Sequence, residues 1–212
     1  MRDIPLFTTH NGIASLYFKK IPYTKEAFVE IRDSQSCHAL LKECIDVCVM
    51  AGAESIYATG HVDIERYPLY CAVMHYSVPK QQLSSTNAVA LPISIEQKDW
   101  WRDIYNRKML HVPSASVLSD SDLSAMIREG SAQCVYSGCS VIGIGVAHDE
   151  RIHAVASIVP CGGRDTVLAL ASCLDGDVVS LDVASTNHKA IALYKGLGFE
   201  EMGKVIQWHK IY

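Results

Sequence analysis

The fold of this chain is decided by residues 181–199, which read Leu-Asp-Val-Ala-Ser-Thr-Asn-His-Lys-Ala-Ile-Ala-Leu-Tyr-Lys-Gly-Leu-Gly-Phe. The apolar start predicts a strand, and the polar residues after it predict a loop in which Asn187 can cap a helix. Apolar residues then recur at helical spacing, with Leu193 and Tyr194 on one face, and Gly198 permits a left-handed exit. The segment therefore predicts a strand, a loop and an amphipathic helix.

A second segment, residues 159–166 (Val-Pro-Cys-Gly-Gly-Arg-Asp-Thr), lies between a predicted strand and a predicted helix. Adjacent Gly162 and Gly163 let backbone amides approach a ligand closely, and a helix N-terminus favours a phosphate. Asp165 stands at the expected helix start, where a carboxylate caps the same amides and repels a diphosphate. The residues alone leave two interpretations open, a phosphate-binding turn and an ordinary tight turn.

Periodicity predicts the order α-α-β-β-β-α-β-α-β after residue 90, which indicates a mixed α/β domain. A polar stretch, residues 79–87, predicts a linker, so we expect domains over residues 1–88 and 89–212. The helices of the second domain are expected at residues 95–109, 119–130, 165–174 and 187–197. Its strands are expected at 133–136, 141–147, 152–159 and 178–184, with one or two further strands over 199–212.

The first domain is expected to repeat this outline. A helix (residues 37–50), a glycine, a strand (55–58) and a polar loop follow one another there, as they do over residues 165–187. Two interpretations stay open, a shortened second copy of the same half-fold and an unrelated α/β extension. The loop residues His61, Asp63 and Glu65 leave a separate pair of alternatives open, a set of groups that face a substrate and a charged loop in solvent. Further strands are expected at residues 14–21, 27–31 and 69–78.

Composition excludes several classes of function. The chain has 212 residues, of which 49% are apolar and 20% charged, with a formal net charge of −4, so it is not mainly disordered. The slightly acidic balance provides no basic surface, and we expect no nucleic-acid partner. No apolar run is long enough to span a bilayer, and residues 1–10 lack a signal-peptide core. We therefore expect no membrane association and a cytoplasmic location.

The eight cysteines are expected to be free thiols, because a cytoplasm keeps thiols reduced. Cys44 and Cys48 lie one helical turn apart, but no residue at finger-like spacing completes a zinc site. We therefore predict that they are core residues and that the chain holds no metal. Cys161 beside a helix N-terminus raises the option of a covalent thiol mechanism, which no wider signature supports.

The pattern of residues 178–199, a strand followed by Asn-x-x-Ala-x-x-Leu-Tyr-x-x-x-Gly-Phe, resembles the C-terminal signature of the GCN5-related N-acetyltransferases (GNAT). Residues 159–170 occupy the place of that family's acetyl-CoA loop. The resemblance covers about residues 90–212. It implies an α/β (α+β) fold with a mixed, mostly antiparallel sheet flanked by helices, preceded by an N-terminal α/β extension or degenerate second GNAT-like half.

The resemblance also implies an activity, the direct transfer of an acetyl group from the cosubstrate acetyl-CoA to a primary amine. Backbone amides of Ile158 and Val159 would hold the pantetheine arm between two diverging strands. Asn187 is similar to the family's cofactor-contacting asparagine, and Tyr194 to the tyrosine that protonates the departing thiolate. The diphosphate would lie on a turn formed by Gly162, Gly163, Arg164, Asp165, Thr166 and Val167.

One departure concerns that turn. The family's loop reads Arg/Gln-x-x-Gly-x-Gly/Ala, and here Arg164 and Ala169 fit this pattern while Val167 replaces the first glycine. This departure favours a second hypothesis, a non-catalytic module that binds acyl-CoA or another protein on a GNAT-like fold.

A base must take a proton from the attacking amine, and His153 is the candidate on the strand that leads to the loop. Strand alternation places His153, Val155 and Ser157 on one face. The acceptor, a small-molecule amine or a peptide amine, is not identified by any motif. An exposed sheet edge would allow two copies to pair, so a homodimer is left open as a further partner.

Overall fold

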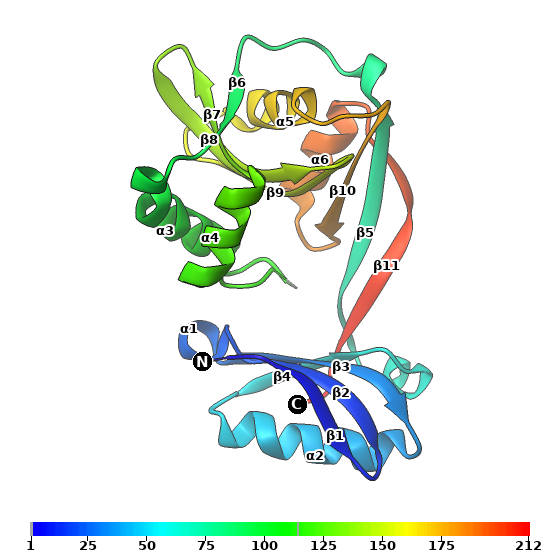
Figure 1. Cartoon of the computed structure of the whole chain (residues 1–212). Helices are drawn as coiled ribbons and strands as arrows, with labels where there is room; N and C mark the ends of the chain where they lie inside the picture. Colours follow the sequence, from blue (N-terminus) through cyan, green and yellow to red (C-terminus); the bar gives the residue numbers. More distant parts are fainter. Residues whose placement is uncertain (1, 114) are drawn as a thin grey trace. The chain divides into compact units, whose positions relative to one another are not determined.

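The computed structural model describes residues 2–113 and 115–212, and Figure 1 shows the order of its elements. The strands are β1 (Ile4–Thr9), β2 (Gly12–Tyr17), β3 (Glu26–Ser34), β4 (Ser55–Thr59), β5 (Leu69–Pro79), β6 (Val89–Pro92), β7 (Ala132–Ser137), β8 (Ser140–His148), β9 (Arg151–Ser157), β10 (Val178–Ala184) and β11 (Glu200–Lys210). The α-helices are α1 (Ile21–Thr24), α2 (Cys37–Met50), α3 (Lys98–Met109), α4 (Asp120–Glu129), α5 (Gly163–Ser172) and α6 (His188–Gly196). Three 3-10 helices are η1 (Val62–Arg66), η2 (Lys80–Gln82) and η3 (Ile95–Gln97).

The predicted fold class is confirmed, and each predicted helix or strand overlaps an observed element of the same type. The sequence did not predict β1, α1 or β6. Helix α1 lies at the end of the segment 14–21, which was expected to be entirely strand, because Pro22 occupies the first turn of this short helix. Strand β6 has four residues, of which only Ala90 is buried, so it carries no apolar alternation that could be recognised.

The chain divides into two compact units. Unit 1 contains Met1–Val73, Leu110–Val117 and Lys204–Tyr212, and unit 2 contains Met74–Met109 and Leu118–Gly203. The chain passes from one unit to the other within β5, at both ends of Leu110–Val117, and within β11. The units are thus discontinuous in sequence, whereas the predicted domains, 1–88 and 89–212, are continuous; the division into domains stays a prediction.

Unit 1 has the strand order β1-β2-β3-β4-β11, and all its neighbouring strands are antiparallel except β3 and β4. Helix α2 connects these two parallel strands and covers one face of the sheet (Figure 1). Its buried residues include Leu40, Cys44 and Cys48. Burial raises the pKa of both thiols to about 12, so both stay protonated at neutral pH and pack as core residues, as predicted.

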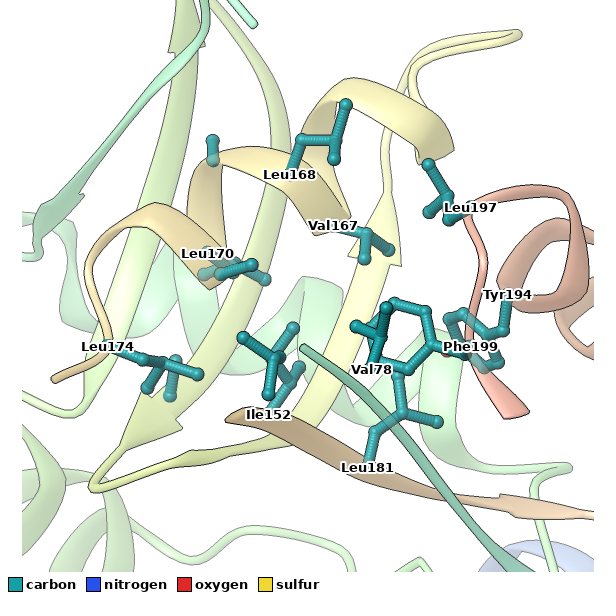
Figure 2. Packing of buried hydrophobic residues seen from close by; sticks show 14 of the residues in the cluster. Val78, Ile152, Val167, Leu168, Leu170, Leu174, Leu181, Tyr194, Leu197 and Phe199 are labelled. Carbon is teal, nitrogen blue, oxygen red and sulfur yellow. The ribbon is translucent and has the colours of Figure 1, made fainter. Parts of the chain in front are cut away.

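Unit 2 has the strand order β5-β10-β9-β8-β7-β6, in which β9 and β10 are the parallel pair connected by α5. Its core combines α5, α6 and strands β5, β9 and β10. Figure 2 shows Val167 and Leu170 of α5 in this core, together with Leu181 of β10 and Tyr194 of α6. Tyr76 and Val78 of β5 belong to the same cluster, so β5 is part of the core of unit 2.

The two units repeat one topology. Strands β1, β2 and β3 form antiparallel pairs and are followed by α2 and the parallel strand β4. Strands β7, β8 and β9 do the same and are followed by α5 and β10. The strand after the first set, β5, lies beside β10, and the strand after the second set, β11, lies beside β4. This arrangement matches the interpretation of a second copy. Each set of strands is extended by the strand that follows the other set in the sequence.

Helix α5 lies very close to β8. A Cβ atom at Gly143 would overlap the side chain of Thr166, and one at Gly145 would overlap Leu170. Thr166 is fully buried and its hydroxyl donates to the Gly162 carbonyl at 2.7 Å, so it has no room to move aside. Two glycines on one strand therefore determine how closely the helix approaches the sheet.

Gly143→Ala should therefore lower the free energy of unfolding by about 1–3 kcal/mol, the usual cost of overpacking a core. Gly196→Ala is the matched control, because nothing lies within 4 Å of a Cβ there and alanine favours the helix by roughly 0.5–1 kcal/mol over glycine. Urea denaturation of both variants measures the difference. Equal stabilities of the two variants would contradict this account of the contact between α5 and β8.

Candidate functional site

The parallel strands of unit 2 separate soon after they meet. The register of β9 and β10 contains two pairs, Ser180 with Arg151 and Leu181 with Ile152, although each strand continues beyond them. In unit 1, by contrast, β3 and β4 stay paired along all of β4, from Ser55 to Thr59. A gap between diverging strands is thus a property of the second copy.

The ladder between β8 and β9 determines which backbone groups of β9 face this gap. The Ile158 amide donates to the Ile142 carbonyl at 2.9 Å, so it is not the free donor that was predicted. Because residues of an antiparallel strand bond alternately to either side, the amides of Val155 and Ser157 point away from β8. Val155 and Ser157 therefore take the place of Ile158, and the role of Val159, which follows the end of β9, stays a prediction.

A β-bulge changes the faces that were predicted for β9. The register passes from Val146 opposite Ala154 to Ala147 opposite Ile152, which leaves His153 as the extra residue. Val155 and Ser157 pair with Gly145 and Gly143, the two glycines beneath α5, whereas His153 lies on the other face. The prediction that His153, Val155 and Ser157 share one face is therefore wrong.

The loop after β9 leads directly into α5. The helix begins at Gly163, two residues earlier than predicted, and the Gly162 amide donates to the Val159 carbonyl at 3.3 Å. The amides of Gly163, Arg164 and Asp165 are the first-turn donors that an α-helix leaves without internal acceptors. They are suited to an anion such as a diphosphate.

Asp165 does not cap this helix. Its carboxylate accepts from the Thr86 hydroxyl at 3.0 Å, and no side chain caps the helix start at Gly162. The sequence suggested a cap because it placed the helix start at Asp165 itself. The neighbouring Arg164 guanidinium is exposed and donates to the Ser84 hydroxyl at 2.7 Å, which leaves a positive charge at the helix start.

Thr166 and Val167 do not offer side chains to a ligand. Both are fully buried, and the Thr166 amide and hydroxyl both bond to the Gly162 carbonyl. Val167, which takes the place of a family glycine, packs in the core of unit 2 (Figure 2). The predicted diphosphate turn is therefore reduced to the backbone of residues 162–165.

The α6 segment has the geometry that its sequence predicts. The Asn187 side chain accepts from the Ala190 amide at 3.3 Å, and Gly198 takes the left-handed conformation after the helix. Tyr194 is buried beside Phe199, with ring centroids 5.8 Å apart (Figure 2). Burial raises the pKa of Tyr194 to about 12, so the phenol stays protonated at neutral pH.

His153 lies near ionisable groups of both kinds, with His148 and Arg151 on one side of the balance and Asp149 and Asp182 on the other. Its ring stacks on that of His148 with centroids 4.0 Å apart, and Arg151 is on the same strand. Desolvation, followed by the charges of His148 and Arg151, lowers the pKa of His153. A neutral imidazole can accept a proton, but no carboxylate of the described residues is hydrogen-bonded to His153 to orient it.

A second histidine was missed by the sequence analysis. The Nδ1 atom of His75 on β5 lies 2.9 Å from Oδ1 of Asp182 on β10, and Arg151 forms an ion pair with Oδ2 of the same carboxylate. Because Tyr76 and Leu181 face the core, alternation places His75 and Asp182 on the opposite face. Alternation along β5 could have assigned His75 to that face, but its pairing with a residue 107 positions away has no local signal.

Unit 1 has its own polar groups, which include the loop residues singled out in the sequence. His61 and Glu65 line a cavity of about 610 Å³. Ligand atoms of Cys37, His61 and Asp63 lie within 4.8 Å of one another, a spacing that could hold a metal ion. However, His61 Nδ1 already accepts from the Asp63 amide, and Arg66 pairs with the Asp63 carboxylate.

Among the described residues, no helix is long and apolar enough to cross a membrane.

Tyr194→Phe should change how stability depends on alkaline pH. A tyrosine whose folded pKa is about 12, against about 10 when unfolded, contributes stability below pH 10 that is lost as pH rises towards 12. The free energy of unfolding of the wild type should fall by about 2 kcal/mol relative to Tyr194→Phe between pH 9 and pH 12. Urea titrations at the two values measure this change. A constant difference would show that Tyr194 is not desolvated.

No family model and no curated protein matches this sequence. Its structure is similar to a GCN5-related N-acetyltransferase from Sphaerobacter thermophilus, with a TM-score of 0.57 and 10% identity over 94% of this chain and 76% of that one. A GCN5-related N-acetyltransferase from Anabaena variabilis gives a TM-score of 0.61 and 9% identity over 93% of this chain and 59% of that one.

A third similar structure is a tandem GNAT protein from the clavulanic acid biosynthesis pathway. It gives a TM-score of 0.50 and 12% identity, over 93% of this chain and 78% of that one. The matches extend over more than nine-tenths of this chain, so they include both copies of the repeated topology. This chain therefore has the fold of the GCN5-related N-acetyltransferases.

Proposed function

We propose that this protein is an acetyl-CoA-dependent N-acetyltransferase that transfers an acetyl group directly to a primary amine. The observation that carries the proposal is the separation of β9 and β10 after two register pairs, while their counterparts β3 and β4 stay paired. Free strand amides beside such a gap can hold the two amide groups of a pantetheine arm. The similar acetyltransferase structures support the same assignment at the level of fold.

The residues around the gap suit the two ends of the cosubstrate. Val155, Ser157 and Val159 supply the strand amides, and the turn at residues 162–165 supplies helix-start amides for the diphosphate. Arg164 adds a positive charge beside them. The side-chain oxygen of Asn187 (Oδ1) accepts the helix-capping hydrogen bond from the Ala190 amide. The side-chain nitrogen (Nδ2) is therefore the group that remains to donate to the cosubstrate.

Tyr194 is the proposed acid. When the amine nitrogen attacks the thioester carbon, a C–N bond forms and the C–S bond breaks, which leaves an electron pair on sulfur. The Tyr194 hydroxyl donates its proton to that sulfur and later regains one from solvent. A raised pKa, about 12, keeps the proton on Tyr194 until the thiolate appears.

One observation favours the alternative, a non-catalytic module that binds acyl-CoA or another protein. Val167 is fully buried where the family has a glycine, so fewer backbone groups approach the diphosphate. Absence of turnover together with cosubstrate binding would select this alternative. Under the main proposal, the acceptor is a small-molecule amine or a peptide amine, the site is cytoplasmic, and neither nucleic acid nor membrane takes part.

Calorimetric titration should show acetyl-CoA and CoA binding at micromolar Kd, about −8 kcal/mol, with weaker binding of 3′-dephospho-CoA only if the 3′-phosphate is also contacted. Release of the CoA thiol is then measured with glycine, spermidine, an aminoglycoside and a peptide with a free N-terminus. Tyr194→Phe should lower turnover about 100-fold or more and keep the Kd within twofold, as expected for an acid acting in the transition state.

Tyr105→Phe is the matched control, because Tyr105 is also a buried tyrosine of unit 2 with a pKa raised by desolvation. It should keep both turnover and affinity. If the protein binds none of the three nucleotides, the proposed function is wrong. If it acetylates an amine and Tyr194→Phe is fully active, only the role of Tyr194 is wrong.

A further inference from the structure

We infer that His75 is the general base of this reaction and that Asp182 orients it, an inference that rests on the proposed function. The polar cluster consists of His75 on β5, Asp182 on β10 and Arg151 on β9. Each residue thus comes from a different strand, and β5 is the strand that follows the first copy of the topology. The general base of the second copy would therefore come from β5, the strand that directly follows the first copy in the sequence.

The hydrogen bond to Asp182 determines where the His75 ring carries its proton. A carboxylate can only accept, so the contact of 2.9 Å requires a proton on Nδ1 of His75. The neutral ring then has its lone pair on Nε2, and no described residue is hydrogen-bonded to that atom. Nε2 is thus available to take a proton from an amine.

Asp182 is held in place from its other side. Arg151 forms an ion pair with Oδ2, while Oδ1 accepts from His75, so both carboxylate oxygens are occupied. About a quarter of the Asp182 side chain is exposed, and about a third of the His75 side chain, so the ring is accessible while the carboxylate is fixed by two partners. Asp182 is therefore a positioning residue.

The cluster lies where the two strands separate. Leu181 and Ile152 form the last register pair, so Asp182 on β10 is the first residue beyond it. The charged and titratable groups around the cluster on this side of the sheet include His75, Asp182, Arg151, His153 and His148, with Asp149 beside His148. His153 is also beyond the last pair, but it stacks on His148 and has no carboxylate partner among the described residues. His148 has a carboxylate partner of its own, Asp149 at 3.1 Å, but this pair lies at the end of β8. His75 is the histidine whose carboxylate partner lies where β9 and β10 separate.

The proton balance is complete with these groups. Nε2 of His75 takes a proton either from the ammonium before its nitrogen attacks, or from the nitrogen of the tetrahedral adduct once the C–N bond has formed. Tyr194 gives a proton to the sulfur as the C–S bond breaks. His75 then returns its proton to solvent, and Tyr194 takes one back, so no other reactant is needed.

The test uses the full chain with acetyl-CoA and ethylamine, a small amine that needs no specific acceptor pocket, and follows release of the CoA thiol. His75→Gln should lower kcat about 100-fold or more and remove the acid limb of the pH–rate profile, with the Kd for acetyl-CoA within twofold. His153→Gln, the rival base, should keep more than a third of the activity. His38→Gln, an exposed histidine on α2, is the unchanged control.

Asp182→Asn tests the positioning role. Because Arg151 can only donate, the new amide should turn its oxygen to Arg151 and its nitrogen to His75, which moves the ring proton to Nε2. Nitrogen-15 NMR should show this change of tautomer at His75, with kcat lowered about as much as in His75→Gln and an unchanged KM. Asp182→Glu should restore part of the activity.

The outcomes separate the two proposals. If the wild type does not bind acetyl-CoA, or binds it but releases no thiol above the uncatalysed rate, the proposed function fails, and this inference fails with it. If the wild type is active while His75→Gln keeps full activity, or His153→Gln loses it, only the inference about His75 is overturned. An unchanged tautomer and kcat in Asp182→Asn would overturn the positioning role of Asp182.

Discussion

The close contact between α5 and β8 is the constraint on which the rest of unit 2 depends. Gly143 and Gly145 carry no side chains, so Thr166 and Leu170 of the helix lie directly on the strand. A helix at this depth has to begin immediately after β9, within the short turn that ends at Gly162. Its first-turn amides are then presented beside the end of β9 itself. The geometry that could receive a diphosphate is thus a consequence of core packing, and the buried Val167 belongs to that packing.

The same topology is used in two ways within the chain. In unit 1, β3 and β4 remain hydrogen-bonded to the end of β4, and a 3-10 helix capped by His61 follows. In unit 2, β9 and β10 part after two pairs, and a full α-helix capped by Asn187 follows. A closed pair satisfies its backbone groups internally, whereas an open pair leaves donors that need a partner. Of the two copies, the second is the one whose backbone can serve a ligand.

Local signals in the sequence were sufficient for most of the fold. Helix α2 was predicted to the residue, because its apolar positions recur at one period and a glycine follows it. The capping role of Asn187 and the left-handed Gly198 were likewise readable from a single segment. Predictions failed where a local pattern was interrupted. A one-residue bulge at His153 moved Val155 and Ser157 to the other face, and the pairing of the Ile158 amide depended on the register with β8.

Long-range pairing explains what the sequence could not show about the site. A polar stretch after residue 79 suggested that β5 belongs with the first ninety residues, yet residues 74–79 of β5 lie in unit 2. There Tyr76 and Val78 complete the core, while His75 meets Asp182 on the opposite face. One strand thus connects the stability of unit 2 to the chemistry proposed for it. Strand β11, which follows the second copy in sequence, lies beside β4 of the first copy, just as β5 lies beside β10 of the second. Each copy is thus completed by the strand that follows the other copy. This exchange gives a physical reason for the two copies to stay in one chain, even though only the second has an open pair of strands.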